Sequence, residues 1–310
     1  MKTRPIGSLN VSVVGIGCNN FGMTIDERRS ADVVHAALAS GINFFDTADI
    51  YGGTKSEEFL GKALAGRRHQ AVIATKFGMR VDASRQGGAR PDYIRQSVEG
   101  SLKRLGTDRI DLYQLHTPDP KVPIADTLGA LNQLVKAGKV REIGCSNFSA
   151  EQLRAAHAPV KAGASRFVSV QNQYSLLHRE AEAEVLPTCD KLALAFLPYF
   201  PLANGLLTGK YQKGTPPPTG TRMAMSWAAA GLTERNFAVV DALRAIAQQS
   251  GRTLLELAIS WLLRQQAVSS VIAGATSPEQ VRANAQAGGW QMSTEDLAAI
   301  DQITASTMSA

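Results

Sequence analysis

Short apolar runs recur along the whole chain, and segments with a helical period separate them. Eight runs of this kind occupy residues 12–17, 42–47, 71–76, 110–116, 142–147, 167–174, 192–199 and 269–275. Apolar side chains fill each run almost continuously, which is typical of strands buried on both faces of a parallel sheet. A half-exposed antiparallel strand would instead alternate apolar and polar positions. The pattern therefore predicts eight parallel strands.

The segments between these runs predict helices. In residues 30–40, apolar positions such as Val33 and Ala37 fall on one face of a helix. Residues 92–106 show the same spacing, and Gly106 follows the last apolar position as a helix stop would. Comparable patterns fill residues 124–139 and 149–157.

The alternation of strand and helix predicts an α/β protein with the (β/α)₈ TIM barrel architecture. Such barrels have about 250 residues plus insertions, so we expect residues 1–310 to form a single barrel domain. A doubly wound open sheet is the competing architecture, and it needs a G-x-G-x-x-G loop after an early strand. The glycines of residues 15–22 do not keep that spacing. The barrel is therefore favoured.

One interval of the chain departs from the regular alternation. Residues 210–227 contain three consecutive prolines, which cannot lie inside a helix or strand. Two helical patterns follow, so we expect a long loop and extra helices between strands 7 and 8, on the face where barrels carry their sites. Residues 1–10 and 293–310 are interpreted as terminal additions, the second containing a helix with Thr294 as its N-cap.

Composition narrows the class of protein. Hydrophobic residues make up 44% of the chain and charged residues 19%, which predicts a soluble globular protein. The net charge is +6, but the basic residues are scattered in pairs, so we expect neither nucleic acid nor membrane as a partner. The three cysteines lack C-x-x-C spacing, which favours a reducing compartment such as the cytoplasm. Oligomeric state is not indicated.

Polar residues at the ends of the predicted strands are the candidate chemistry. Asp46, Lys76 and His116 end the second, third and fourth runs, and Tyr51 lies on the short loop after the second. Ser146 and Asn147 end the fifth run, and Gln171 falls within the sixth. Because the carboxyl ends of barrel strands converge on one face, these side chains are expected to meet.

The first four residues suit acid–base chemistry on a carbonyl or an alcohol. A tyrosine has an unperturbed pKa of about 10, and a nearby ammonium such as Lys76 favours its ionised form. Asp46 would hold that ammonium, and His116 could donate a hydrogen bond to a substrate oxygen. The alternative is an aldolase in which Lys76 forms a Schiff base, but this needs an uncharged lysine. The histidines show no metal-binding spacing, so no metal is expected.

Several ordered motifs resemble the aldo-keto reductase family across nearly the whole chain. They are FDTADIYG, ATKFG, GTDRIDLYQLHTPD, IGCSNFS, QNQYS, LLTGKY and GATSPEQVRANA. The resemblance is to the branch that includes potassium-channel β subunits and bacterial oxidoreductases. It implies a (β/α)₈ barrel that reduces aldehydes or ketones with hydride from a nicotinamide cofactor, usually NADPH. It also implies that Tyr51 is the general acid, that Lys76 and Asp46 lower its pKa, and that His116 orients the carbonyl.

The same resemblance implies a set of cofactor-binding residues. Those at the nicotinamide and pyrophosphate are Ser146, Asn147, Gln171, Tyr199, Leu202, Asn204, Leu206 and Lys210, and those at the adenosine are Gly274, Thr276, Gln280, Arg282 and Asn284. Many family members carry a lysine near Gly274 and an arginine at the position of Gln280. This sequence departs from both, so the nearby Arg282 is the candidate for a 2′-phosphate, and a solvent-facing position at helical spacing is the alternative. NADPH is the expected cofactor, with NADH as the alternative.

The substrate pocket is expected from three loops, which are residues 18–22, the segment after Lys76, and residues 211–235. Candidate wall residues on or near them are Phe21, Met79, Tyr113 and Trp227. Nothing in these loops names the substrate or the direction of the reaction. Two functions remain open: a carbonyl reductase, which could also run in reverse on sugars or alcohols, and a cofactor-binding regulatory or redox-sensing subunit with little turnover.

Overall fold

Eight parallel strands form a barrel in the computed structural model, which describes residues 1–79 and 87–305. The strands are β3 (Val14–Gly17), β4 (Phe44–Asp46), β5 (Val72–Phe77), β6 (Ile110–Leu115), β7 (Val140–Ser146), β8 (Phe167–Gln173), β9 (Ala195–Tyr199) and β10 (Val271–Gly274). They pair in the order β10-β3-β4-β5-β6-β7-β8-β9. The ring closes where the Phe196 amide donates to the Ala267 carbonyl at 2.7 Å and the Ser269 amide donates to the Phe196 carbonyl at 3.1 Å. The predicted barrel is confirmed.

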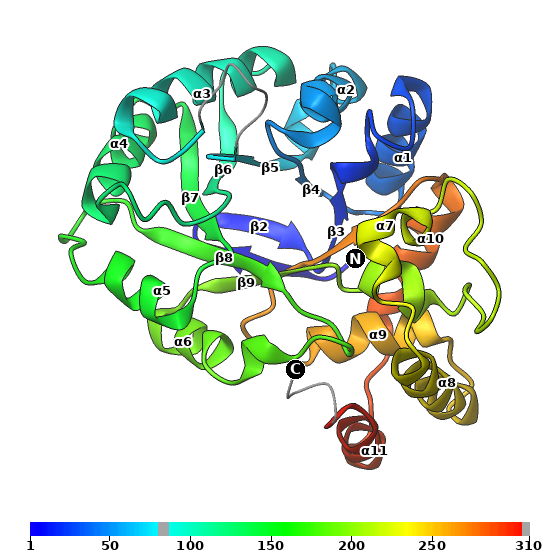
Figure 1. Ribbon diagram of the computed structural model, residues 1–310. Coiled ribbons are helices and arrows are strands. Elements are labelled where there is room, and N and C mark those ends of the chain that lie inside the picture. The colour runs from blue at the N-terminus through cyan, green and yellow to red at the C-terminus, as the bar shows by residue number, and fades with distance from the viewer. Residues whose placement is uncertain (80–86, 306–310) are drawn as a thin grey trace.

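Helices surround the strands on the outside of the barrel (Figure 1). Those that connect successive strands up to β9 are α1 (Glu27–Ala39), α2 (Lys55–Ala63), α3 (Pro91–Leu105), α4 (Ile124–Lys136), α5 (Ala150–His157) and α6 (Val185–Leu192). The long interval between β9 and β10 contains α7 (Ser226–Ala229), α8 (Glu234–Gln249) and α9 (Leu254–Leu263). The chain then continues through α10 (Pro278–Gln286) and α11 (Thr294–Thr304). No helix in the described part of the chain is long and apolar enough to span a bilayer.

Helix ends follow the local sequence, with one correction. Gly106 adopts a left-handed conformation with φ of 60° and ends α3, as predicted. Ser293, and not Thr294, is the N-cap of α11, because its hydroxyl accepts from the Asp296 amide while the Asp296 carboxylate bonds back to Ser293. Two adjacent residues can both cap a helix, so the sequence pattern placed the boundary one residue late.

The N-terminal segment forms a hairpin that fills one end of the barrel. Strands β1 (Thr3–Ile6) and β2 (Leu9–Ser12) pair antiparallel, and β2 crosses the middle of the ring of strands in Figure 1. Ile6 packs with Phe44, which begins β4, in a buried apolar cluster inside the barrel. The hairpin therefore closes the end at which the strands begin. The predicted first run divides between β2 and β3.

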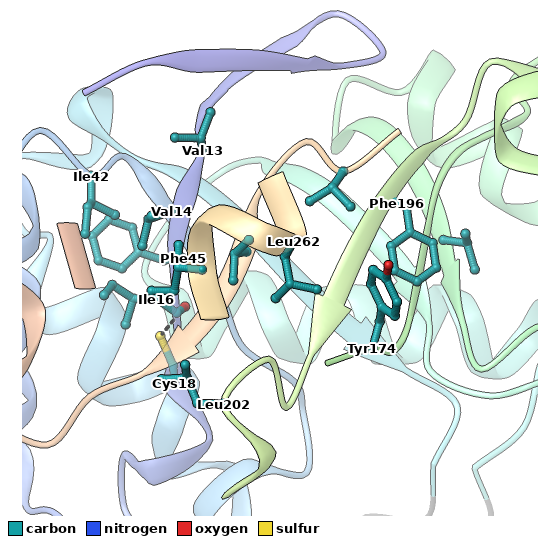
Figure 2. Close-up of a cluster of buried hydrophobic side chains, with 14 of the residues drawn as sticks. Val13, Val14, Ile16, Cys18, Ile42, Phe45, Tyr174, Phe196, Leu202 and Leu262 are labelled. Atoms are coloured by element: carbon teal, nitrogen blue, oxygen red, sulfur yellow. Dashed lines mark hydrogen bonds between the residues drawn. The ribbon is translucent and has the colours of Figure 1, made fainter. Parts of the chain in front are cut away.

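A second apolar layer joins the outside of the barrel to its helices. Figure 2 shows Ile16 of β3 on one side of α9 and Phe196 of β9 on the other, with Leu262 of α9 between them. All three are completely buried. Tyr174 packs edge-on against Phe196 with ring centroids 5.8 Å apart. Because α9 bridges the first and seventh barrel strands, this layer holds together the part of the ring where β9 meets β10.

Candidate active site

The structure brings together the four predicted catalytic residues at the carboxyl ends of neighbouring strands. Asp46 is the last residue of β4, Lys76 lies in β5, His116 follows β6, and Tyr51 begins the turn before α2. Lys76 Nζ donates to Asp46 Oδ2 at 2.6 Å and lies 3.4 Å from the Tyr51 hydroxyl. The Tyr51 and His116 rings meet edge to face, with centroids 5.9 Å apart.

Lys76 is held as an ammonium although it is completely buried. Burial disfavours its charge, but Asp46 and Tyr51 outweigh that effect and raise the pKa of Lys76 above its ordinary value. The ammonium also donates to the Thr47 carbonyl at 3.0 Å. A Schiff-base lysine must lose its proton, so these contacts oppose the aldolase alternative.

Two glutamine amides complete the carboxylate that holds Lys76. Asp46 Oδ1 accepts from Gln171 Nε2 at 2.9 Å and from Gln114 Nε2 at 3.3 Å. Gln114 was not predicted, because it lies in the middle of an apolar strand and gives no signal at the strand end. The predicted role of Gln171 was contact with a cofactor amide, and the structure also gives it this contact with Asp46.

The expected pKa of Tyr51 needs a correction. Burial raises the pKa of Tyr51 above the usual tyrosine value, Lys76 and Arg222 lower it, and Asp46 raises it further. The predicted effect of Lys76 is present, but Asp46 acts in the opposite sense to the prediction, and burial decides the net direction. Tyr51 is therefore protonated at neutral pH, which is the state that a general acid requires.

His116 is neutral under ordinary conditions. Burial, assisted by the charge of Lys76, lowers the pKa of His116 to about 3. Its backbone carbonyl accepts from Asn147 Nδ2 at 2.9 Å, which fixes the residue between β6 and β7. A neutral imidazole carries one N–H, so His116 can donate a hydrogen bond beside the Tyr51 ring without bringing a positive charge.

A cavity of about 830 Å³ opens over these groups. Asp46, Tyr51 and His116 line it, while Lys76 lies behind them. Eleven predicted cofactor residues also line it: Ser146, Asn147, Gln171, Tyr199, Leu202, Asn204, Lys210, Gly274, Thr276, Gln280 and Asn284. A single cavity thus joins the reactive tyrosine to residues on β7, β8, β9 and β10, as an elongated ligand requires.

Two predicted cofactor residues lie outside this lining. Leu206 is only 1% exposed and belongs to the apolar core. Arg282 is exposed and pairs with Glu279 one helical turn away, at 2.7 Å. Arg282 was a candidate for a phosphate because it lies near the predicted adenosine residues, but its helical spacing places it at the surface beside Glu279.

The lining has features that fit a dinucleotide. Asn204 Oδ1 is buried and has no hydrogen-bond partner among the described residues. The backbone around it is left-handed, with φ of 56° at Asn204 and 97° at Gly205. Successive amides in such a conformation can form an anion-binding concavity. Together with Lys210 in the same lining, these backbone amides could hold a pyrophosphate.

The predicted wall residues are mostly not part of the cavity lining. Phe21 and Tyr113 are completely buried, and Tyr113 stacks on Phe77 with centroids 4.6 Å apart. Tyr113 alternates with the inward-facing Gln114, so its side chain faces the helices. Met79 is exposed and does not line the cavity. The Trp227 side chain and residues 80–86 lie outside the described part of the structure.

Two residues that line the cavity come from predicted loops, which are residues 18–22 and the proline-rich loop of residues 211–235, and a third, Phe200, follows β9. Asn20 follows β3, and its Oδ1 accepts from Arg222 of the proline-rich loop at 2.8 Å. The Arg222 guanidinium also lies 5.6 Å from the Phe200 ring centroid. Burial lowers the pKa of Arg222, but an arginine remains charged. Sequence reasoning identified both loops, but it named none of these three residues.

The barrel and its site define an oxidoreductase of the aldo-keto reductase class. Residues 13–305 match the family model described as the aldo/keto reductase family. The chain therefore belongs to the aldo/keto reductase family.

Relatives with known names agree with this assignment. The chain is 36% identical to the aldo-keto reductase YhdN of Bacillus subtilis (strain 168), over 97% of this chain and 92% of that protein. It is 35% identical to a probable aldo-keto reductase 1 of Glycine max, over 93% and 84% of the two chains.

Two solved structures superpose along nearly their full length. The glycerol dehydrogenase AKR11B4 from Gluconobacter oxydans matches with a TM-score of 0.86 and 31% identity, covering 100% of this chain and 97% of that one. The holo form of aldo-keto reductase AKR11C1 from Bacillus halodurans matches with a TM-score of 0.81 and 32% identity, covering 98% and 96%. The strand-end site thus lies in a fold that these enzymes share.

Proposed function

We propose that this protein reduces aldehydes or ketones to alcohols with a nicotinamide cofactor and with Tyr51 as the general acid. The observation that carries the proposal is the position of Tyr51, which lines the cavity and whose hydroxyl lies 3.4 Å from a buried ammonium. Family membership supports the class of reaction. The arrangement of the Asp46, Tyr51, Lys76 and His116 side chains supports the catalytic roles that we assign to them.

Ser146, Asn147 and Gln171 would hold a reduced nicotinamide, which would supply the hydride that the carbonyl carbon receives. Tyr51 gives its hydroxyl proton to the carbonyl oxygen, so the C=O π bond is replaced by one C–H and one O–H bond. Lys76 stabilises the tyrosinate that remains, because its ammonium lies beside that oxygen. His116 donates a hydrogen bond that orients the carbonyl. Asp46 keeps Lys76 charged throughout.

At neutral pH, the raised pKa of Tyr51 keeps the tyrosine in the protonated form that catalysis of reduction requires. Reduction needs the protonated tyrosine, whereas alcohol oxidation needs the tyrosinate to accept a proton. Because burial raises the pKa of Tyr51, oxidation should increase with pH. The reverse reaction on sugars or alcohols is therefore proposed as the alkaline activity.

We propose NADPH as the cofactor, with NADH as the alternative. Ser146, Asn147 and Gln171 would lie at the nicotinamide carboxamide, Tyr199 at its ring, and Lys210 at the phosphates. Arg282 would meet a 2′-phosphate only by leaving Glu279, with which it pairs at 2.7 Å. A preference for NADPH thus depends on an exchange of partners by Arg282.

Short hydroxylated carbonyl compounds are the proposed substrates. Asn20, Thr24 and Arg222 line the same cavity as Tyr51 and offer hydrogen bonds to hydroxyl groups. The solved relative from Gluconobacter oxydans is named a glycerol dehydrogenase, and glycerol is such a compound in its reduced form. Both observations favour polar substrates over large apolar ones.

The test is consumption of NADPH and NADH with a panel of hydroxyaldehydes, ketones and dicarbonyls, with Tyr51→Phe measured alongside. We expect carbonyl-dependent oxidation by the wild type and a loss of about 10²- to 10⁴-fold in kcat for the variant. Its dissociation constant for the cofactor should not change, because only a hydroxyl is removed. Equal turnover by the two proteins would reject Tyr51 as the acid. Tight cofactor binding without turnover by the wild type would instead favour the regulatory or sensing subunit.

A further inference from the structure

Two threonines lie beside catalytic residues in the chain but face away from the cavity. Thr47 follows Asp46, Thr75 precedes Lys76, and both threonines are completely buried. Successive side chains of a strand point to opposite faces, so a threonine on the helix side accompanies each charged group on the cavity side. Each threonine is adjacent in the chain to a catalytic residue. A hydrogen bond that fixes the threonine therefore also restricts the position of that catalytic residue.

Adjacent residues of α2 bind both threonines. The Thr75 hydroxyl donates to Glu57 Oε1 at 2.6 Å. The hydroxyls of Thr47 and Ser56 lie 2.8 Å apart. Ser56 gives its own proton to the Cys18 carbonyl at 2.8 Å, so Thr47 must be the donor to Ser56. Ser56 and Glu57 are themselves completely buried.

The third catalytic group lies in the turn directly before the same helix. Tyr51 begins the turn that leads directly into α2 (Lys55–Ala63), so the position of α2 sets the position of the tyrosine. Through Ser56 and Glu57, α2 is tied to the strand that ends in Asp46 and to the strand that contains Lys76. One dipeptide thus connects the three segments whose side chains meet at 2.6 and 3.4 Å in the site.

Glu57 is also held by a side chain of the neighbouring helix α3. Arg104 of α3 donates from Nε to Glu57 Oε2 at 2.6 Å, so both carboxylate oxygens are engaged. The helices α2 and α3 lie close together here, because a Cβ added at Gly61 would lie 2.4 Å from the Leu105 carbonyl oxygen. The pair leaves little freedom for α2 to slide along β5.

We infer that Ser56 and Glu57 are positioning residues, which hold the Tyr51 hydroxyl at its distance from Lys76 and thereby set the efficiency of proton transfer. This rests on the proposed function, because it assigns Tyr51 the role of acid. Neither residue touches the cavity, so neither is expected to affect the affinity for cofactor or substrate.

Thr75→Val tests the inference with the smallest change, since it removes one hydroxyl and nearly preserves shape. We expect kcat to fall about tenfold, because small displacements of reacting groups are costly. KM and the dissociation constant for NADPH should stay within about twofold of wild type, since no contact in the cavity is altered. Thr75→Ser restores the hydroxyl and should recover turnover. Glu57→Gln should act in the same direction as Thr75→Val.

A second readout does not depend on turnover. The ionisation of Tyr51 can be followed by the ultraviolet difference between each protein and the same protein carrying Tyr51→Phe, over a pH titration. The titratable or charged groups that face Tyr51 are Asp46 of β4, Lys76 of β5, His116 after β6, Tyr199 of β9 and Arg222 of the proline-rich loop. In Thr75→Val all five remain, but Lys76 is held less closely. The pKa of Tyr51 should rise further, because the ammonium then offsets burial less.

Asp111→Asn is the matched control. Asp111 is also a buried carboxylate, paired with Arg68 and Arg141 at 2.7 and 3.2 Å, but it lies near the start of β6, away from the cavity. This variant should lose stability while leaving kcat and the titration of Tyr51 as in the wild type. If Thr75→Val and Glu57→Gln lower the melting temperature but change neither readout, the two residues of α2 are merely structural and the inference is overturned. If the wild type turns over no substrate, the proposed function fails, and the titration alone decides the positioning role.

Discussion

His116 shows how the surroundings of one residue set its chemistry. An exposed histidine changes charge near neutral pH, but burial and the nearby Lys76 lower the pKa of His116 to about 3. The imidazole is therefore neutral throughout the pH range in which enzymes are normally assayed. A neutral imidazole can donate a hydrogen bond without carrying a charge, and the activity should show no inflection from this residue between pH 5 and about 8.

The same pKa predicts a dependence of stability on pH. The unfolded chain binds a proton at His116 with a pKa of 6.5 and the folded chain only at about 3. The unfolded state thus binds more protons between these values, so stability is fully present above pH 6.5 and is lost as the pH falls towards 3. We expect the free energy of unfolding to drop by about 2 to 3 kcal/mol between pH 7 and about 4.5 from this residue. Urea unfolding of wild type and His116→Phe at both pH values measures it, and an equal drop in the two proteins would contradict the assignment.

Some residues of the site could be predicted from the sequence and others could not, for physical reasons. Asp46, Lys76 and His116 could be predicted because strand ends converge in a barrel, whatever the rest of the fold does. The net pKa of Tyr51 could not, because it depends on how deeply the finished site is buried. Arg222 and Asn20 meet although about two hundred residues separate them. No local pattern marks such a pair.

The turn between β4 and α2 is the element on which the tyrosine depends. Gly52 and Gly53 both have positive φ, of 58° and 65°. A Cβ at Gly52 would lie 2.4 Å from the Phe21 carbonyl oxygen, whereas at Gly53 it would meet no described atom within 4 Å. Gly52 is thus needed for close packing as well as for its conformation, and the loop after β3 supports the turn directly.

The two glycines provide a matched comparison. Gly53→Ala should cost about 1 to 2 kcal/mol of stability, because only the left-handed conformation is penalised. Gly52→Ala should cost more and should lower kcat by about tenfold or more, because the backbone that carries Tyr51 must move. Thermal unfolding and steady-state kinetics of both variants test this. Equal kcat values for the two variants would show that contact with the loop after β3 does not position Tyr51.

In the molecule as a whole, the two ends of the barrel differ, because one end carries the cavity and the other is closed by apolar packing. The cavity opens at the carboxyl ends of the strands, while the hairpin of β1 and β2 closes the other end. The sequence predicted the eight barrel strands because each must be apolar on both faces. It did not separate β2 from β3, because both are apolar and the junction at Val13 is buried as well.

This division predicts that a substitution at the hairpin end of the barrel changes stability without changing activity. Ile6→Ala removes a completely buried side chain of the hairpin and should cost about 2 to 5 kcal/mol of unfolding free energy. Its kcat and KM at 25 °C should match the wild type, because the substitution lies at the end away from the cavity. Thr3→Ala, at an exposed position of the same hairpin, is the control. A fall in kcat with Ile6→Ala at a temperature where the protein is fully folded would show that the two ends are coupled.

The order of the elements in the chain has a consequence for synthesis on the ribosome. Asp46, Tyr51, Lys76 and His116 all lie in the first 116 residues, but Arg222 and β10 (Val271–Gly274) come much later. The ring cannot close before β10 has been synthesised, because β10 pairs with β3, which leaves the ribosome much earlier. A nascent chain therefore carries the four proposed proton-transfer residues long before the cavity around them is complete. The cavity therefore depends on segments that are synthesised well after the four residues that it brings into use.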